Sequence, residues 1–307
     1  MANLRNFFIT FCICLVVFSL AAASIVNYFT ATEKNQQTEL PVTSIPDAVD
    51  TDVVEFGDGS INEETIVGDT FSVIVTVLDN DKTRVKSVCV IKADKQLKNY
   101  WFMAYPMNMT VPVDNVDTPL SDILLYHDKD FFYDKLYAIT GVEFDYRFEF
   151  TESGLAEFID CLGGLDYDVP QDMVEYGENS SIATINLKEG EQKLNGRKVV
   201  QLLKFSSYEN GVQGMCATQT SVAKAVLSLI SSTKLDYVKE NLSLLLGFSD
   251  TDFTPEVFTE NEGMISSYAN FIKTESQYPG YETETDSGEK VFIPDIESAT
   301  MRFRQYR

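Results

Sequence analysis

The chain has 307 residues with 44% hydrophobic content, enough for one large α/β domain or two small ones. Its 47 acidic residues outnumber 24 basic ones, and a body with this balance repels phosphate backbones, so we expect no nucleic-acid partner. A single histidine, His127, and five cysteines without a CxxC pair exclude His-based triads and zinc sites.

The N-terminal segment predicts a membrane anchor. No charged side chain lies between Arg5 and Glu33, and residues 7–29 are apolar enough to span a bilayer as one helix. Residues 1–6 then form a cytoplasmic stub, and the rest of the chain lies outside the cytoplasm. A cleavable signal peptide stays open as the alternative, because Ala21-Ala22-Ala23 offers a small-residue cleavage site.

Residues 30–65 are polar and acidic and contain Pro41 and Pro46, which predicts an extracytoplasmic spacer. We expect residues 66–307 to form the folded domain. Three β-branched or aromatic runs joined by short polar turns predict an antiparallel meander. These runs are 71–78, 87–92 and 100–105, and helices are expected at 120–126 and 131–139.

The stretch from 136 to 170 organises the domain. Residues 142–150 alternate apolar and polar, which predicts a strand with one aromatic face. The residues of that face are Phe144, Tyr146, Phe148 and Phe150. Thr151 is the expected N-cap of a helix that ends at Gly163-Gly164, and another extended segment follows.

Strand, helix and strand in such close succession predict a layered α/β domain with a mixed central sheet flanked by helices. Further helices are expected at 195–203, 219–231 and 237–246, followed by a polar loop, an extended segment at 291–294 and a last helix. The cysteines of the domain, Cys89, Cys161 and Cys216, are expected to fill the core.

Three separated segments resemble the LytR-CpsA-Psr family, also known as the cell envelope-related transcriptional attenuator domain. They are ITGVEFDYRFEF (139–150), FIDCLGGLDYDVP (158–170) and INLKEGEQKLNGRKVVQLLKF (185–205). Their order and spacing match the family, and the resemblance extends from about Thr70 to the C-terminus.

The resemblance implies a single-pass protein of a bacterial cell membrane, with its domain on the extracytoplasmic side. Family members transfer polyprenyl-pyrophosphate-linked glycopolymers to peptidoglycan in cell-wall biogenesis. The lipid tail lies in an apolar pocket between sheet and helices, while arginines and an Asp-bound Mg²⁺ hold the pyrophosphate. A diphosphate leaving group needs such concentrated positive charge.

The chain departs from the family at this charged site. Asp79 and Arg84 keep family residues, but Lys86 stands where the family places a second metal-binding aspartate. The usual Ile-Pro-Arg-Asp is Tyr-Pro-Met-Asn at 105–108, Arg-x-Arg is Lys-Phe-Ser at 204–206, and Arg-x-x-Arg-Gln is Met-Cys-Ala-Thr-Gln at 215–219. Each lost arginine removes a phosphate contact worth about 1.5–3 kcal/mol, so we expect weakened or lost transfer.

By the resemblance, the candidate catalytic residues are Asp79, Lys204 and Gln219. Arg84, Lys204 and Gln219 would contact the pyrophosphate, and Asp79 would be the magnesium ligand. Simpler interpretations stay open beside these: Asp79 as a turn residue, Arg84 as a salt-bridge partner, Lys204 as a solvated lysine at a helix end, and Gln219 as polar helix surface.

Three hypotheses follow. The first is a divergent family member, a pseudoenzyme that binds a lipid-linked glycopolymer, peptidoglycan or an assembly partner without efficient transfer. The second is an active magnesium-dependent phosphotransferase rebuilt around the four candidate residues. The third is a non-catalytic envelope scaffold or interaction ectodomain without a lipid pocket.

Overall fold

The computed structural model describes residues 70–141, 143–177 and 181–305. The predicted stub, anchor and spacer lie outside these residues and remain predictions. Within the described residues, no helix is both long enough and apolar enough to cross a membrane.

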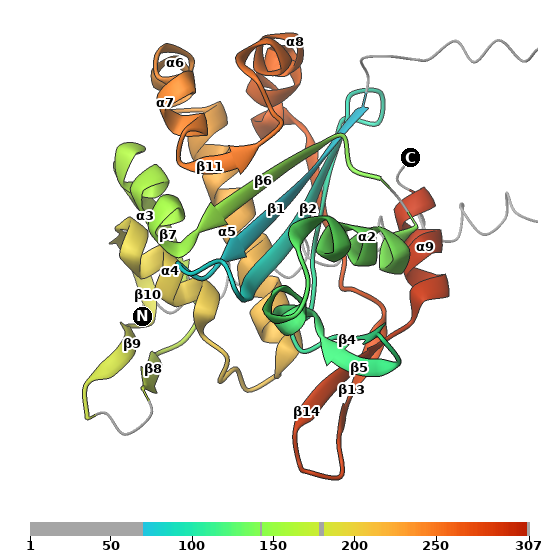
Figure 1. The fold of residues 1–307 in the computed structure, drawn as a ribbon. Helices are drawn as coiled ribbons and strands as arrows, with labels where there is room; N and C mark the ends of the chain where they lie inside the picture. The colour runs from blue at the N-terminus through green and yellow to red at the C-terminus, as the bar shows by residue number, and fades with distance from the viewer. Residues whose placement is uncertain (1–69, 142, 178–180, 306–307) are drawn as a thin grey trace, which may run out of the picture. The chain divides into compact units, whose positions relative to one another are not determined.

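A six-stranded sheet with the order β11-β6-β1-β2-β3-β12 forms the centre of the domain (Figure 1). Its strands are β1 (Thr70–Leu78), β2 (Val85–Asp94), β3 (Asn99–Ala104), β6 (Tyr146–Thr151), β11 (Ser249–Thr251) and β12 (Ile272–Glu275). Strands β1, β2 and β3 form the expected antiparallel meander, whereas β6 runs parallel to β1 and β12 parallel to β3. The prediction of a mixed sheet is therefore confirmed.

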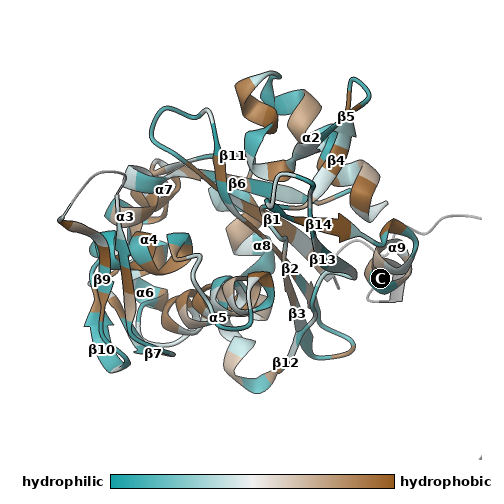
Figure 2. Cartoon of the chain, turned by 90° about the horizontal axis from the view of Figure 1, so that it is seen from below, coloured by the Kyte–Doolittle hydropathy of each residue, from teal (hydrophilic) through white to brown (hydrophobic). Residues whose placement is uncertain are grey.

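Helices cover both faces of this sheet, so β1 and β2 are buried along almost their whole length. One face packs against η1 (Leu120–Leu125), α2 (Lys129–Thr140) and α9 (Ile296–Gln305). The other face packs against α3 (Glu152–Cys161), α4 (Gly196–Lys204), α5 (Val212–Ser231), α6 (Leu235–Glu240), α7 (Leu242–Leu246) and α8 (Pro255–Ser266). Figure 2 shows this division, with α2 and α9 on one side of the strands and α3 to α7 on the other.

Two-stranded antiparallel sheets and a single helical turn complete the described part of the domain. They are β4 (Thr110–Val113) with β5 (Val116–Pro119), β7 (Leu165–Val169) with β10 (Gly190–Leu194), β8 (Met173–Tyr176) with β9 (Ala183–Leu187), β13 (Gly280–Glu284) with β14 (Lys290–Pro294), and η2 (Tyr268–Asn270). The predicted segment after Gly164 is extended, but it pairs in this way with β10 and stays outside the central sheet.

The predicted helix start at Thr151 is confirmed, because its hydroxyl oxygen accepts a hydrogen bond from Gly154 N at 3.0 Å. Gly163 and Gly164 follow the end of α3 with φ angles of +86° and +85°, which favour glycine. Gly196 opens α4 so close to α3 that an added Cβ would lie 1.9 Å from the carbonyl oxygen of Ala156.

Four details of the predicted elements are wrong. Phe144 precedes β6 and packs near Phe303 in the core of the opposite sheet face, so it does not share a face with Phe148 and Phe150. Residues 237–246 belong to two short helices, and 120–125 form a 3₁₀ helix. Helix α5 begins at Val212 rather than Gln219, because burial of its first turns stabilises a segment with little helical periodicity.

The α3–α4 contact yields a stability prediction. Gly196→Ala should lower the free energy of unfolding by about 2–3 kcal/mol, because the new methyl group must displace a backbone carbonyl. Gly263→Ala in α8 is the matched control: no atom lies within 4 Å of its added Cβ, and the change should stabilise the protein by up to about 1 kcal/mol. Denaturant unfolding of both variants tests this, and equal effects would contradict it.

Candidate functional site

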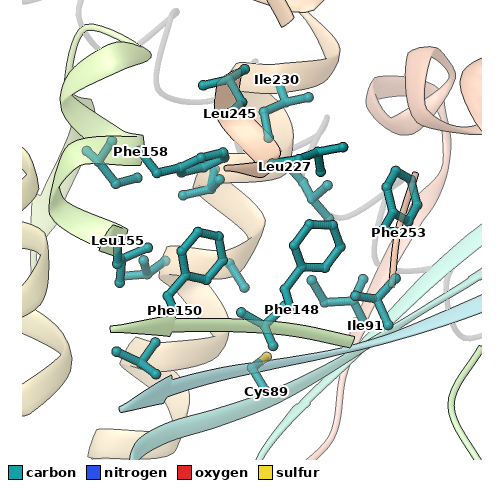
Figure 3. A pocket seen from close by; sticks show the side chains of 18 of the residues that line it. Cys89, Ile91, Phe148, Phe150, Leu155, Phe158, Leu227, Ile230, Leu245 and Phe253 are labelled. Carbon is teal, nitrogen blue, oxygen red and sulfur yellow. The ribbon is translucent and has the colours of Figure 1, made fainter. Parts of the chain in front are cut away.

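An apolar cavity of about 220 Å³ lies between the sheet and the helices α3 to α8, which cover one of its two faces (Figure 3). Side chains from β1, β2, β3 and β6 and from α3 to α8 line it. Those from the strands are Phe71, Val73, Val75, Val77, Ser87, Cys89, Ile91, Tyr100, Phe148 and Phe150. Those from the helices and loops are Leu155, Phe158, Ile159, Val199, Leu203, Gln219, Val222, Ala223, Val226, Leu227, Ile230, Val238, Leu242, Leu245, Leu246, Phe253, Phe258 and Ile265.

The sheet forms one wall through its period of two. Every second residue of β1 and β2 faces the cavity, and β6 contributes Phe148 and Phe150, whose rings stack at 6.2 Å. Figure 3 shows these two rings rising from β6 towards Phe158 of α3 and Leu227 of α5. Of the four aromatic residues predicted to share one face, Phe148 and Phe150 line the cavity.

The two ends of the cavity differ in polarity. One end lies where β1 finishes and contains Ser87, which pairs with Val77, and Gln219 in the first half of α5. The other end is closed by α7, α8 and the last turns of α5. Its lining is apolar apart from the Tyr100 hydroxyl, which donates to the backbone carbonyl of Met264 in α8 at 3.0 Å. A ligand that fits has a long apolar part and a small polar end.

Gln219 is the unusual residue of this wall. Only 2% of its surface is exposed, and neither its Oε1 nor its Nε2 has a hydrogen-bond partner in the described part of the chain. A buried amide without partners costs free energy, so its two atoms need a hydrogen-bond partner that the described residues do not supply. The interpretation of Gln219 as polar helix surface is therefore wrong, because the side chain lines the cavity.

Asp79 lies just after β1, at the polar end of the cavity, and its carboxylate organises the turn into β2. Its Oδ1 accepts from Thr83 N at 2.8 Å and from Arg84 N at 3.2 Å, and its Oδ2 accepts from the Thr83 hydroxyl at 3.2 Å. Burial raises the pKa of Asp79, but these hydrogen bonds and the charge of Lys86 outweigh it and hold the pKa below its usual value.

This arrangement does not fit a magnesium ion. Mg²⁺ prefers several oxygen ligands in octahedral geometry, and a carboxylate free to bind it. Asp79 uses both oxygens within its own turn, and the neighbouring position carries the cationic Lys86. Among the described residues, no group of three acidic, cysteine or histidine side chains is placed to hold a metal.

The other two predicted residues are paired with carboxylates of the chain. Arg84 Nη1 lies 2.6 Å from Asp122 Oδ1, and Lys204 Nζ lies 2.9 Å from Glu152 Oε1, whose side chain is 15% exposed. Glu152 opens α3, and the next residue, Ser153, donates its backbone N–H to Asn80 Oδ1 at 2.9 Å. The turn after β1, the start of α3 and the end of α4 thus meet at one end of the cavity.

Two further carboxylates lie close to the loop that joins α4 to α5, and the sequence by itself did not predict either of them. Glu175 Oε1 accepts from the backbone N–H and the hydroxyl of Ser206 and of Ser207, at 2.8–3.2 Å. Glu282 Oε2 lies at the start of α5, 2.8 Å from where a Cβ on Gly211 would be. Neither acid has a local sequence signal, because β8 and β13 reach this site only through tertiary packing.

Residues weighed for smaller roles also find their places. Arg147 points away from the cavity, over the ring of Tyr133 at 5.3 Å. Of the aromatic cluster at 100–105, Tyr100 lines the cavity while Trp101 and Tyr105 belong to the opposite core. Cys89 and Cys216 are buried core residues, and burial raises the pKa of each thiol to about 12.

Comparisons with known proteins identify the family and the fold of the chain. The sequence model of the LytR_cpsA_psr family matches residues 27–305. No curated protein sequence matches the chain. The fold is similar to TagV of B. subtilis, with a TM-score of 0.64 and 18% identity over 78% of this chain and 97% of TagV.

Two further solved structures share the fold. Protein gbs0355 from Streptococcus agalactiae has a TM-score of 0.67 and 14% identity, covering 78% of this chain and 88% of its own. A structure of TagT bound to LI-WTA has a TM-score of 0.62 and 15% identity, covering 78% of this chain and 89% of TagT.

The unpartnered amide predicts that Gln219→Leu stabilises the protein. Leucine keeps the volume and removes two buried polar atoms, so the free energy of unfolding should rise by about 1–2 kcal/mol. Gln213→Leu, on the exposed side of the same helix, should change it by less than about 0.5 kcal/mol. Destabilisation by Gln219→Leu in denaturant unfolding would show that the amide has structural partners.

Asp79 generates a prediction about pH. Asp79→Ala should lower the free energy of unfolding by about 1–2 kcal/mol at pH 7, through loss of the turn hydrogen bonds. Because the folded-state pKa is lowered, this stabilisation exists above the unfolded pKa and is lost as pH falls through the folded pKa. The difference between the two proteins should therefore shrink in acid. Asp81→Ala in the same turn is the control, and a difference that grows in acid would refute the assignment.

Proposed function

The chain belongs to the LytR-CpsA-Psr family, and on that premise we propose that it is an extracytoplasmic, membrane-anchored protein of bacterial cell-envelope assembly that holds a lipid without carrying out glycopolymer transfer. The family and the fold shared with TagV and with TagT support a role in cell-envelope glycopolymer transfer. The apolar run at 7–29 supports the anchor.

The cavity supports the lipid part of the proposal. It is lined by hydrocarbon side chains over nearly its whole length and lies between the sheet and the helices α3 to α8. Along the hydrocarbon-lined part of the cavity a water molecule would lack hydrogen-bond partners, so water does not compete for this part. A hydrophobic chain gains free energy by entering it, roughly in proportion to the area that it removes from water.

The single observation that carries the loss of transfer is the pairing of the site's cations and donors with the chain's own acids. Glu152 neutralises Lys204, Asp122 neutralises Arg84, and Glu175 accepts the donors of the loop after α4. Phosphoryl chemistry on a diphosphate depends on uncommitted positive charge at the phosphate oxygens. Here a bound diphosphate would face carboxylates, at a cost of about 1–4 kcal/mol for each pair of unit charges 4 Å apart.

We therefore propose that Asp79 and Lys204 stabilise the polar end of the cavity and do not take part in a reaction. The hydrogen bonds of Asp79 support this part of the proposal, since both of its carboxylate oxygens are used within the turn. An active phosphotransferase with a rebuilt site would need the Lys204–Glu152 or the Arg84–Asp122 ion pair to break during turnover.

A turnover assay with the full-length protein tests the proposal. The protein is incubated with a polyprenyl-diphosphate-linked saccharide and peptidoglycan, with and without Mg²⁺, and release of the polyprenyl phosphate is measured. We expect release at the rate of the protein-free control. Magnesium-dependent release that falls at least tenfold in Asp79→Ala would refute the proposal and favour a rebuilt phosphotransferase. An absence of both turnover and lipid binding would instead favour an envelope scaffold.

A further inference from the structure

The polar end of the cavity specifies which lipid it suits. We propose that the lipid ends in an uncharged hydroxyl group, so that the cavity is built for a long-chain lipid alcohol rather than for a phosphorylated lipid, and that Gln219 binds this hydroxyl. The inference rests on the proposed lipid-binding function and goes beyond it by naming the ligand class and the residue that selects it.

The chemistry of the amide separates the two ligand classes. Gln219 presents an acceptor, Oε1, and a donor, Nε2, and neither has a partner among the described residues. A hydroxyl group both donates and accepts, so one hydroxyl can satisfy either atom, or both through a bridging position. An ionised phosphate only accepts, so it satisfies Nε2 but leaves Oε1 facing negative oxygens.

The surroundings of Gln219 give no compensation for a negative charge. No charged side chain is among the residues that line the cavity. Of the cationic groups at this end, Lys204 and Arg84 are held by Glu152 and Asp122 at 2.9 and 2.6 Å, and Lys86 lies near the carboxylate of Asp79. Transfer of an uncompensated anion into such a site is far more costly than transfer of an alcohol.

The position of the amide fixes the orientation of the ligand. Gln219 lies on α5 before Val222, Val226 and Ile230, which line the rest of the cavity on the same helix. A lipid whose hydroxyl reaches Gln219 therefore lays the start of its hydrocarbon chain along α5. Ser87 on β2 lines the same end and adds a hydroxyl to its polar groups.

Binding to the full-length protein in detergent tests the inference. Three probes of equal chain length are compared, a polyprenol, its monophosphate and its diphosphate, together with a hydrocarbon that lacks a polar end. We expect the alcohol to bind at least tenfold more tightly than the diphosphate. Gln219→Leu should weaken alcohol binding about five- to tenfold and leave hydrocarbon binding unchanged, and Gln213→Leu should change neither.

Two outcomes separate the inference from the proposed function. Diphosphate binding as tight as alcohol binding, or an unchanged alcohol affinity in Gln219→Leu, would overturn the inference while the lipid cavity stands. Failure of all probes to bind would overturn both. Val226→Trp fills the cavity and should abolish binding of every probe, and residual binding in this variant would place the lipid elsewhere and also overturn the inference. Denaturant unfolding of each variant establishes that it is folded.

Discussion

The parallel pairing of β6 with β1 is the constraint on which the rest of the structure depends. It aligns Val77 with Phe150 and Val75 with Phe148, so both strands turn apolar side chains towards the same helices. It also sets the start of α3 beside the turn that follows β1, where Ser153 bonds to Asn80. One strand pairing therefore creates both the wall of the cavity and its polar end.

The framework of the domain and the charged groups at the polar end of the cavity depend on different interactions. Apolar side chains build the sheet and place α3, α4 and α5, whereas Lys204 and Arg84 pair with carboxylates of the chain. This separation is physically reasonable, because burial of apolar surface stabilises the fold and charged residues at a rim contribute little to it. Substitutions among these charged groups therefore need not disturb the apolar cavity.

Glu175 shows how hydrogen-bond donors after α4 can be satisfied by the chain itself. Its carboxylate accepts four hydrogen bonds from Ser206 and Ser207, the kind of backbone and hydroxyl donors that bind an external anion. An internal acid in this position satisfies the donors permanently and removes the need for a ligand there. Gln219 is the contrasting case, because the fold leaves its amide buried with both atoms unpartnered.

Much of the domain follows from the sequence by itself. Alternation along 142–150, the cap at Thr151 and the paired glycines at 163–164 are local signals, and local geometry alone decides them. The family resemblance located the turn at Asp79 and the substitutions around Lys204. The sequence could not show that Phe144 joins the opposite core, that α5 begins at Val212, or that Glu175 and Glu282 reach the site, because contacts across long stretches of chain determine these features. Whether a lysine is free or neutralised, and whether an amide is solvated or buried without partners, depends on neighbours that only the tertiary structure brings together.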